Sequence, residues 1–255
     1  MKPKEIPVCG LAAVQALFAR DPAAIKRLYF DYPTSRKLAK LSSHLAKTKR
    51  IYRVVTPSEL EKVGGTVHHG GVVAVIEAQP LLSPAPGDVA RWTANRAPLL
   101  ILDRIGNAHN LGAIARTAAF FGIEDLLLRD HPQQALPGEA AYRVAEGGLE
   151  HLHVWSVPEL PEFCLQLRKT YDVIGAAVGP TSRPLGEWQA SRGRAHGPAK
   201  PIALVLGNEE QGLSPEVAQA CTAQILIPGK GNRVESLNVS VAAAVFMWEL
   251  WARLK

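Results

Sequence analysis

Residues 225–240 read Ile225-Leu-Ile-Pro-Gly-Lys-Gly-Asn-Arg-Val-Glu-Ser-Leu-Asn-Val-Ser240, and an apolar segment follows them. The apolar, β-branched start predicts a short strand that ends at Pro228 and then a loop that contains glycines. Ser236 is expected to cap the next helix, because the apolar residues after it recur at helical spacing. Free N–H groups at a helix N-terminus favour electron-rich ligands. The small polar residues expected there are Ser236, Asn238 and Ser240.

Two earlier segments have the same strand, loop and helix design. An apolar run over 201–206 ends in Gly207-Asn-Glu-Glu-Gln-Gly-Leu-Ser214, and another over 99–103 leads to Asn107-Ala-His-Asn-Leu-Gly-Ala-Ile-Ala-Arg116. Further apolar runs alternate with helical patterns, which predicts an α/β fold with a parallel sheet covered on both faces. The first of these helices is expected to begin at Asn110 and to end at Gly122. Arg116 then lies off its apolar face.

These three motifs, in this order, resemble those of the SpoU family, also called the TrmH family, of RNA ribose 2'-O-methyltransferases. The first motif matches through Asn110, Gly112 and Arg116, the second through Gly207, Glu209 and Gly212-Leu-Ser214, and the third through Ile227-Pro228 and Glu235-Ser-Leu-Asn-Val-Ser240. The resemblance implies a trefoil-knotted parallel-sheet methyltransferase domain, preceded by a small α/β domain of the L30e-like type.

The resemblance also implies a site. It places S-adenosylmethionine against backbone groups of Gly207, Ile227 and Leu237. A guanidinium keeps its proton at any working pH, so Arg116 is expected to grip a phosphate and to stabilise the developing alkoxide rather than to act as a base. The implied catalytic group is Arg116, Asn110, Glu209, Ser236 and Asn238.

Two stretches depart from the family pattern. Val144-Ala-Glu146-Gly-Gly-Leu-Glu150 carries a carboxylate at Glu146, where many relatives have small residues and where RNA is expected to approach. The loop over 228–234 is slightly longer and more basic than the usual form. The first departure bears on the choice of substrate, and the second on how the edge of the cofactor is covered.

Residues 1–79 are predicted to form a separate small α/β unit. The pattern, which includes Val8-Cys-Gly-Leu11 and His69-Gly-Gly-Val-Val-Ala74, is similar to the L30e-like substrate-binding domain that many SpoU enzymes carry. The alternative is a packing domain without a role in RNA binding. Residues 80–98 are rich in proline, which predicts a linker without a helix or a central strand. Residues 99–255 are then the methyltransferase domain.

The positive charge is concentrated in the first part of the chain. The net charge is +6, and residues 1–97 hold 15 Lys and Arg against 7 Asp and Glu, so the remainder is slightly acidic. A dense basic segment attracts phosphate backbones, although a solvated helix face is the alternative. The residues predicted to bind RNA are Arg36, Lys37, Lys40, Lys47, Lys49, Arg50 and Arg53.

Several classes of protein are disfavoured by the sequence. The first residues lack the apolar run of a signal peptide and no stretch is apolar enough to span a membrane, so we expect a cytoplasmic protein. Three widely spaced cysteines suggest neither a disulfide framework nor a zinc site, and no metal is expected. The glycine-rich loops match neither the dinucleotide-binding nor the P-loop fingerprint.

The sequence therefore predicts an S-adenosylmethionine-dependent 2'-O-methyltransferase that acts on structured RNA, ribosomal RNA first and transfer RNA second. A non-catalytic RNA-binding protein on the same fold is the alternative of a different class. A homodimer through the catalytic domain is expected, because the family dimerises there and because Trp248 and Trp251 make the last helix unusually aromatic. The alternative is that this tryptophan pair faces the core.

Overall fold

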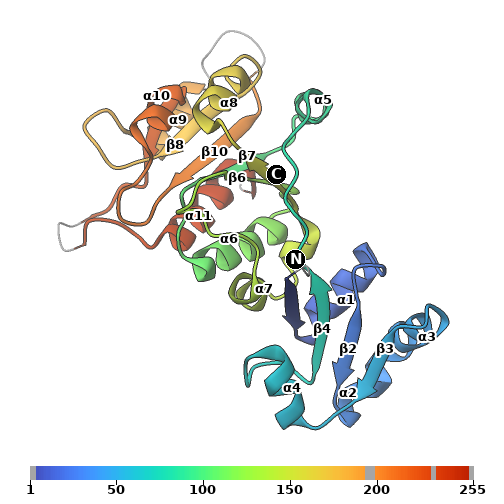
Figure 1. Ribbon diagram of the computed structural model, residues 1–255. Helices are drawn as coiled ribbons and strands as arrows, with labels where there is room; N and C mark the ends of the chain where they lie inside the picture. Colours follow the sequence, from blue (N-terminus) through green and yellow to red (C-terminus); the bar gives the residue numbers. More distant parts are fainter. Residues whose placement is uncertain (1–3, 193–198, 231–233, 253–255) are drawn as a thin grey trace.

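A computed structural model describes residues 4–192, 199–230 and 234–252 and shows two α/β units (Figure 1). The first unit is built on a four-stranded sheet of order β1-β4-β2-β3, in which β4 is antiparallel to β1 and β2, while β2 and β3 are parallel. The α/β character predicted for this unit is confirmed. The elements are β1 (Glu5–Cys9), α1 (Leu11–Arg20), β2 (Arg27–Phe30), α2 (Tyr32–Ser35), η1 (Arg36–Leu38), α3 (Ala39–Lys47), β3 (Ile51–Val54), α4 (Pro57–Gly64) and β4 (Val72–Glu77).

The second unit is built on a seven-stranded sheet of order β7-β6-β5-β10-β8-β11-β9, in which all the pairs are parallel. Its elements are β5 (Leu99–Asp103), α6 (Ala108–Phe120), β6 (Asp125–Arg129), α7 (Glu139–Ala145), η2 (Leu149–His151), β7 (His153–Val157), α8 (Leu160–Leu167), β8 (Asp172–Ala176), β9 (Arg183–Pro184), α9 (Leu185–Arg192), β10 (Ile202–Gly207), α10 (Pro215–Ala220), β11 (Ala223–Leu226), α11 (Val239–Met247) and η3 (Trp248–Ala252).

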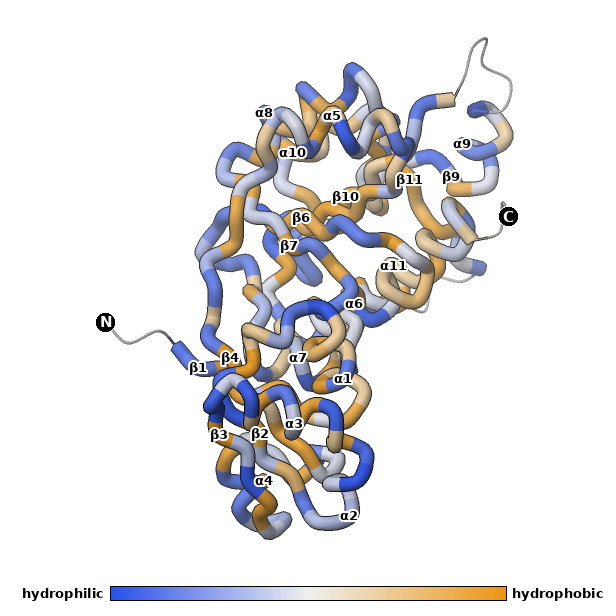
Figure 2. The backbone as a smooth tube through the Cα atoms, turned by 90° about the vertical axis from the view of Figure 1, so that its right-hand side faces the viewer, coloured by the Kyte–Doolittle hydropathy of each residue, from blue (hydrophilic) through white to orange (hydrophobic). Residues whose placement is uncertain are grey.

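Helices cover both faces of this sheet, as the continuous apolar strands predicted. Leu100 and Leu102 of β5 pack with residues of α6, α7 and α11, whereas Leu99 and Ile101 pack with residues of α8 and α10 on the other face. Figure 2 shows the central strands as the most hydrophobic part of the unit. The parallel α/β architecture is thus confirmed. The trefoil knot that the resemblance implies stays a prediction.

The proline-rich segment contains a helix, so the expectation that it could hold none was wrong. Helix α5 (Pro86–Ala94) starts with Pro86 at its first position, where the missing N–H has no intrahelical partner to lose. Asp88 accepts a hydrogen bond from the backbone N–H of Ala85 at 3.0 Å. Trp92 is fully buried and meets the ring of Trp155 edge-on, with 5.7 Å between centroids. The domain boundaries near residues 79 and 98 stay predictions.

Two helix starts also differ from expectation. The cap of α6 is Asn107, whose side chain accepts from the N–H of His109 at 2.8 Å, and Asn110 lies in the first turn. The cap of α11 is Asn238, which accepts from the N–H of Ser240 at 2.9 Å, and Ser236 lies outside the helix. Asparagine bonds the backbone two residues ahead and so competes well for the cap position. The amide of Asn110 is therefore free to act elsewhere.

The two units meet where α1 and β1 contact α7 and η2 (Figure 1). Arg20 of α1 donates through Nη1 to the carbonyl oxygens of Leu149, Glu150 and Leu152, at 3.2, 3.2 and 2.9 Å. Tyr142 of α7 packs against the cores of both units. The segment between α7 and β7 is therefore fixed on one side by the first unit.

Candidate active site

The three motifs meet in one hydrogen-bonded cluster. Glu209, in the loop after β10, accepts from the side-chain amide of Asn110 at 2.8 Å and from the N–H groups of Gly106 and Asn107 at 3.1 and 3.2 Å. The oxygen of the Asn110 amide accepts from Asn238 at 3.2 Å. Residues that lie 128 positions apart, Asn110 and Asn238, are thus joined at the edge of the sheet where its parallel strands end, which is where open α/β sheets bind ligands.

The cluster has a fixed charge and a fixed orientation. Burial raises the pKa of Glu209, but hydrogen bonds from Asn110 and from the backbone N–H groups of Glu209, Gly106 and Asn107 outweigh that effect and hold the pKa below its usual value. The carboxylate therefore remains ionised, and it fixes Asn110 with its amide nitrogen toward Glu209 and its oxygen toward Asn238.

Two of the residues implied to hold the cofactor are close to this cluster in the chain, since Gly207 lies two residues before Glu209 and Leu237 one residue before Asn238. Gly207 ends β10, and a side chain there would collide with the backbone of Gly212 at 2.3 Å, so only glycine fits this turn. Ile227 follows β11, while Leu237 precedes the cap of α11 and is 49% exposed. Backbone groups at strand ends beside an exposed apolar side chain are suited to a cofactor with an adenine ring and a charged tail. Ser236 is exposed in the same stretch.

The loop over 228–234 is described only in part, because residues 231–233 lie outside the described residues. Its expected effect on the edge of the cofactor therefore stays a prediction. On either side of that gap, Lys230 and Val234 are exposed.

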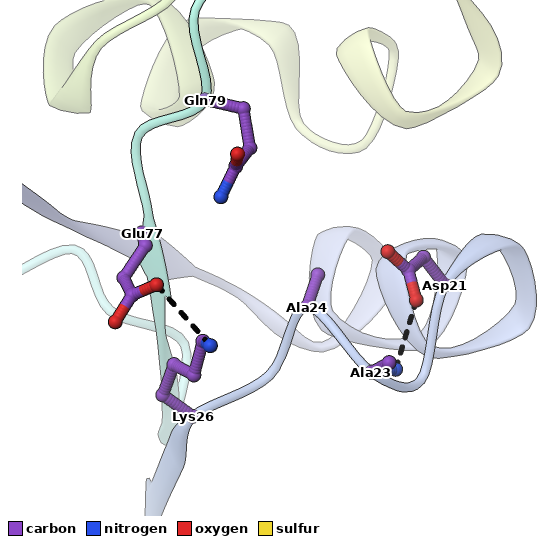
Figure 3. A pocket seen from close by; sticks show the side chains of 6 residues that line it. All are labelled: Asp21, Ala23, Ala24, Lys26, Glu77 and Gln79. Atoms are coloured by element: carbon purple, nitrogen blue, oxygen red, sulfur yellow. Dashed lines mark hydrogen bonds and ion pairs between the residues drawn. The ribbon is translucent and has the colours of Figure 1, made fainter. Parts of the chain in front are cut away.

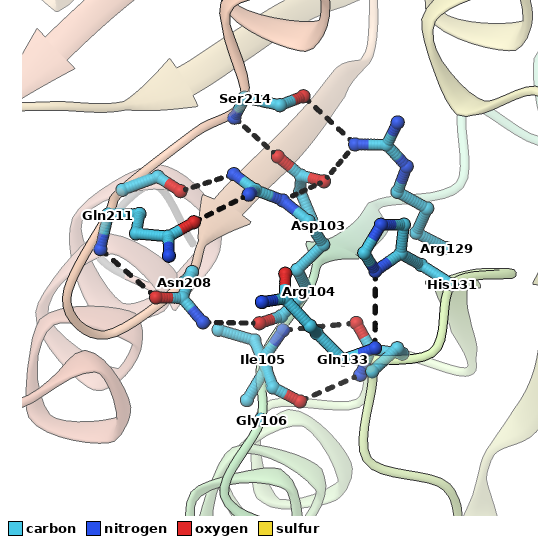
Figure 4. Close-up of polar contacts among 12 residues, drawn as sticks. Asp103, Arg104, Ile105, Gly106, Arg129, His131, Gln133, Asn208, Gln211 and Ser214 are labelled. Carbon is cyan, nitrogen blue, oxygen red and sulfur yellow. Dashed lines mark hydrogen bonds and ion pairs between the residues drawn. The ribbon is translucent and has the colours of Figure 1, made fainter.

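A buried charge network that the sequence reasoning missed supports the second motif (Figure 4). Asp103, at the end of β5, is fully buried, and it accepts from Arg129 at 2.8 Å and from the N–H of Ser214 at 2.6 Å. Arg129 also donates to the hydroxyl of Ser214 at 2.9 Å, and Arg104 bonds to Asp103 and to the carbonyl of Gly212. A charged residue at the end of each of two buried strands was the signal that could have revealed this network.

Arg116 lies apart from the cluster. On one helix, six residues separate the side chains of Asn110 and Arg116 by about 9 Å along the axis and by roughly 120° around it. Arg116 instead forms an ion pair with Glu146, with 3.0 Å between Nη1 and Oε1. Both side chains are more than half exposed, at 56% and 61%. The carboxylate that departs from the family pattern is therefore the partner of the residue expected to be catalytic.

The basic residues predicted to bind RNA lie on η1, α3 and β3 and in the loop before β3. Arg50 differs from the others, because its Nη1 donates to the carbonyl oxygens of Pro22, Ala23 and Ile25 at 2.8 to 3.0 Å. That arginine holds the chain before β2 in place, so it is the least free to meet a phosphate. Six of the predicted RNA-binding residues are exposed, namely Arg36, Lys37, Lys40, Lys47, Lys49 and Arg53.

A shallow pocket at the edge of the first unit contains none of the predicted site residues (Figure 3). Its lining includes Asp21, Gln79 and an ion pair of 3.2 Å between Lys26 and Glu77. In the described part of the chain, no group of three or more His, Cys, Asp or Glu side chains could hold a metal ion. No described helix combines the length and the apolar character that crossing a membrane requires.

Two family models match the chain. The model of the SpoU rRNA Methylase family matches residues 97–248. A second model, described as RNA 2'-O ribose methyltransferase substrate binding, matches residues 7–82. These matches fall on the unit with the seven-stranded sheet and on the unit with the four-stranded sheet, respectively.

Individual relatives agree with these matches. The chain is 32% identical over 255 residues to an Escherichia coli protein named "Uncharacterized tRNA/rRNA methyltransferase YfiF", across 99% of this chain and 69% of the relative. It is 29% identical to the 23S rRNA (guanosine-2'-O-)-methyltransferase RlmB of Acinetobacter baylyi, across 94% of each. Its fold is similar to that of an AdoMet-bound rRNA methyltransferase from Sinorhizobium meliloti, with a TM-score of 0.73 and 22% identity across 98% of this chain and 88% of that one.

Proposed function

The chain belongs to the SpoU rRNA methylase family, and from that premise we propose that it methylates the ribose 2'-hydroxyl of a nucleotide in structured ribosomal RNA. It is an RNA methyltransferase that uses S-adenosylmethionine. Ribosomal RNA is favoured because several relatives, of 27% to 30% identity over nearly the whole chain, are named as 23S rRNA enzymes. Transfer RNA is the second candidate, since the name of another relative allows both substrates. A cytoplasmic location goes with either substrate.

The observation that carries this proposal is the cluster of Asn110, Glu209 and Asn238. It joins one residue from each motif into a rigid polar surface at the carboxyl ends of the strands. S-adenosylmethionine, bound against Gly207, Ile227 and Leu237, would supply an electrophilic methyl group there. The cluster would orient the ribose, and positioning of this kind can account for much of a rate enhancement.

Arg116 has a separate role in the proposal. Its guanidinium is a fork of donors that suits a phosphodiester, and it would hold the phosphate beside the reacting ribose and stabilise charge on the oxygen under attack. The proton of the 2'-hydroxyl would then pass to a phosphate oxygen rather than to Arg116. Ser236 would contribute a hydroxyl next to Leu237, in the segment that leads to Asn238.

The decisive experiment maps 2'-O-methyl groups in total RNA from cells with and without the gene. One position in ribosomal RNA should lose its methyl group in the deletion and regain it when the gene is restored. A loss in transfer RNA would instead assign the second candidate. If every site keeps its methyl group and the purified protein gives no heat with S-adenosylmethionine in calorimetry, the proposal fails.

A homodimer through the catalytic unit is part of the proposal. Phe120 of α6 is 83% exposed and Trp248 is 52% exposed, and Phe121 contacts both rings. Such an exposed aromatic strip is suited to a self-complementary contact across a twofold axis. Trp251 is instead partly buried against the core, so Trp248 is the more accessible of the two to a second copy.

Sedimentation tests the dimer. The protein should sediment as a dimer at micromolar concentration, and Phe120→Glu should sediment as a monomer. Leu165→Glu, which changes a half-exposed apolar residue on α8, should leave the dimer intact. A wild-type monomer would remove this part of the proposal.

A further inference from the structure

Glu146 is placed next to Arg116 by contacts that leave little freedom. It is the C-cap of α7, and its backbone is left-handed, with φ 45° and ψ 43°. Glycine adopts the left-handed backbone conformation without strain, whereas glutamate adopts it at a cost in conformational energy. Two glycines follow, and the chain nevertheless has a carboxylate at the strained position. An outlier of this kind directs attention to function.

The helix and loop that carry Glu146 are pressed against α6. A side chain at Gly148 would lie 2.6 Å from the Cα of Arg116, and one at Gly112 would lie 2.5 Å from the carbonyl oxygen of Ala141. Glycines are therefore needed at both contacts. The backbone that carries Glu146 is fixed beside the backbone that carries Arg116, while the two side chains remain exposed.

The ion pair itself is weak. Both side chains are exposed, and exposed pairs of this length contribute little because water and salt screen them. No second partner holds Arg116 among the described residues. A phosphodiester presents the same kind of charged oxygens as a carboxylate and accepts the same paired hydrogen bonds from arginine. An RNA phosphate that comes close to Arg116 can therefore take the place of Glu146.

We propose that Glu146 selects the substrate by occupying Arg116 until an accurately placed RNA phosphate displaces it. The proposal rests on the role proposed above for Arg116. An RNA that docks loosely leaves Arg116 paired with Glu146, and its ribose is not methylated. A well-docked RNA has to overcome only the weak attraction within the pair, together with the repulsion between its phosphate and the nearby carboxylate. Specificity gained in this way comes from a repulsive element directed at wrong partners.

The test uses the full-length protein with two probes, unmodified 23S rRNA and a mixture of unmodified transfer RNAs, both transcribed in vitro. Glu146→Gln should bind both probes about threefold to fivefold more tightly than wild type, the range set by loss of one exposed charge pair. It should also methylate positions that the wild type leaves unmodified. Glu146→Asp keeps the charge on a shorter stem and should fall in between.

Two controls separate this effect from a general change of charge. Glu162→Gln removes an exposed carboxylate on α8 and should change neither affinity nor methylation pattern. In an Arg116→Ala background, Glu146→Gln should no longer raise affinity, because the residue that it released is absent. A double-mutant cycle on the binding constants measures this coupling directly.

Three results would overturn the inference. Glu146→Gln could behave like Glu162→Gln, or it could raise the affinity for RNA equally with and without Arg116. Either result would mean that Glu146 does not control the access of RNA to Arg116. It could instead lose methylation with unchanged affinity, which would give Glu146 a part in the reaction itself. Wild-type protein that binds S-adenosylmethionine but methylates neither probe would count against the proposed function, and that result is independent of Glu146.

Discussion

Two arginine–carboxylate pairs in the catalytic unit have similar lengths and opposite surroundings. Arg129 and Asp103 are 2.8 Å apart, and their side chains are 17% and 0% exposed. Arg116 and Glu146 are 3.0 Å apart and are mostly exposed. The buried carboxylate also accepts from the N–H of Ser214, whereas the two side chains of the exposed pair have no polar contact other than each other among the described residues.

The difference shows that a distance alone does not reveal what an ion pair does. Taking charges out of water costs several kcal/mol, so the buried pair survives only because each charge has several partners. It holds the second motif in shape and cannot be released without unfolding that region. The exposed pair contributes little free energy, so a ligand can replace one of its members.

The largest effect is expected at the buried pair. Asp103→Ala leaves Arg129 and the N–H of Ser214 without their acceptor, and it should lower the free energy of unfolding by about 3 to 5 kcal/mol. Glu146→Ala, the matched change in the exposed pair, should alter it by less than about 0.5 kcal/mol. Denaturant unfolding measures both. If both variants lose the same free energy of unfolding, the two pairs do not differ in their contribution to stability.

Arg116→Ala should separate catalysis from stability. We expect turnover to fall about 10²-fold or more, because charge on the reacting oxygen and phosphate loses its donor, while the affinity for S-adenosylmethionine and the free energy of unfolding change little. Arg116→Lys keeps the charge but loses the fork, and it should be nearly as slow.

Single-turnover methylation with saturating cofactor measures this change. Arg91→Ala is the matched control, because Arg91 is another partly exposed arginine paired with a carboxylate, Asp88, at 3.2 Å. That variant should methylate normally. Substantial activity in a folded Arg116→Ala protein would exclude Arg116 from the mechanism.

Glu150 sharpens the comparison, because it is a buried carboxylate to which no other described residue donates a hydrogen bond. Burial raises its pKa from 4.5 to about 7, and its own backbone N–H and the nearby Arg20 offset only part of that rise. A rise of this size corresponds to at most roughly 3 kcal/mol. The folded state therefore holds the proton more tightly, so the stabilisation is complete below pH 4.5 and is lost as the pH rises through about 7.

Glu150→Gln removes this dependence on pH. The variant should be about as stable as wild type at pH 4.5 and more stable by about 2 kcal/mol at pH 8, because an uncharged amide is not penalised by burial. Unfolding by denaturant at both pH values measures the difference. A variant less stable than wild type at pH 8 would mean that the ionised carboxylate has a partner after all.

The smallest effect concerns exposed cations far from either pair. Replacing Lys47 and Lys49 with alanine should flatten the slope of log RNA affinity against log salt by up to about 2 units, if each lysine meets a phosphate. Lys169→Ala, an exposed lysine of the catalytic unit, should leave the slope unchanged. Arg50→Ala should instead lower stability, because its guanidinium bonds three backbone carbonyls. An unchanged slope in the double variant would move the RNA surface elsewhere.

The sequence was sufficient to predict the parallel sheet, because continuous apolar runs between helical patterns are typical of strands that are buried on both faces. The resemblance of the three motifs to those of the SpoU family also implied that Asn110, Glu209 and Asn238 share a site, and hydrogen bonds join these three side chains. The expected role of Arg116 on a phosphate and on the developing alkoxide stays untested, and the described contact of its side chain is with Glu146.

The remainder depended on tertiary contacts. Asp103 meets Arg129 only because β5 and β6 are neighbours, which periodicity does not reveal. The choice of Asn107 and Asn238 as helix caps over Asn110 and Ser236 depended on local geometry that several polar residues could satisfy. The hydrogen bonds from Arg50 to backbone carbonyls could not be predicted either, because the sequence does not distinguish an exposed arginine from one that is hydrogen-bonded to the backbone.

The helix in the proline-rich segment changes where the chain can be divided. Trp92 lies against Trp155, the N–H of Ser156 donates to the carbonyl of Leu82, and Tyr171 donates to the carbonyl of Ala97. The segment is thus part of the catalytic unit, and it covers one face of the sheet. A fragment that starts at Leu99 would expose that face and should aggregate, whereas one that starts at Gln79 should stay monodisperse. Tags, protease sites and fused partners therefore belong before residue 80, where the chain crosses between the two units.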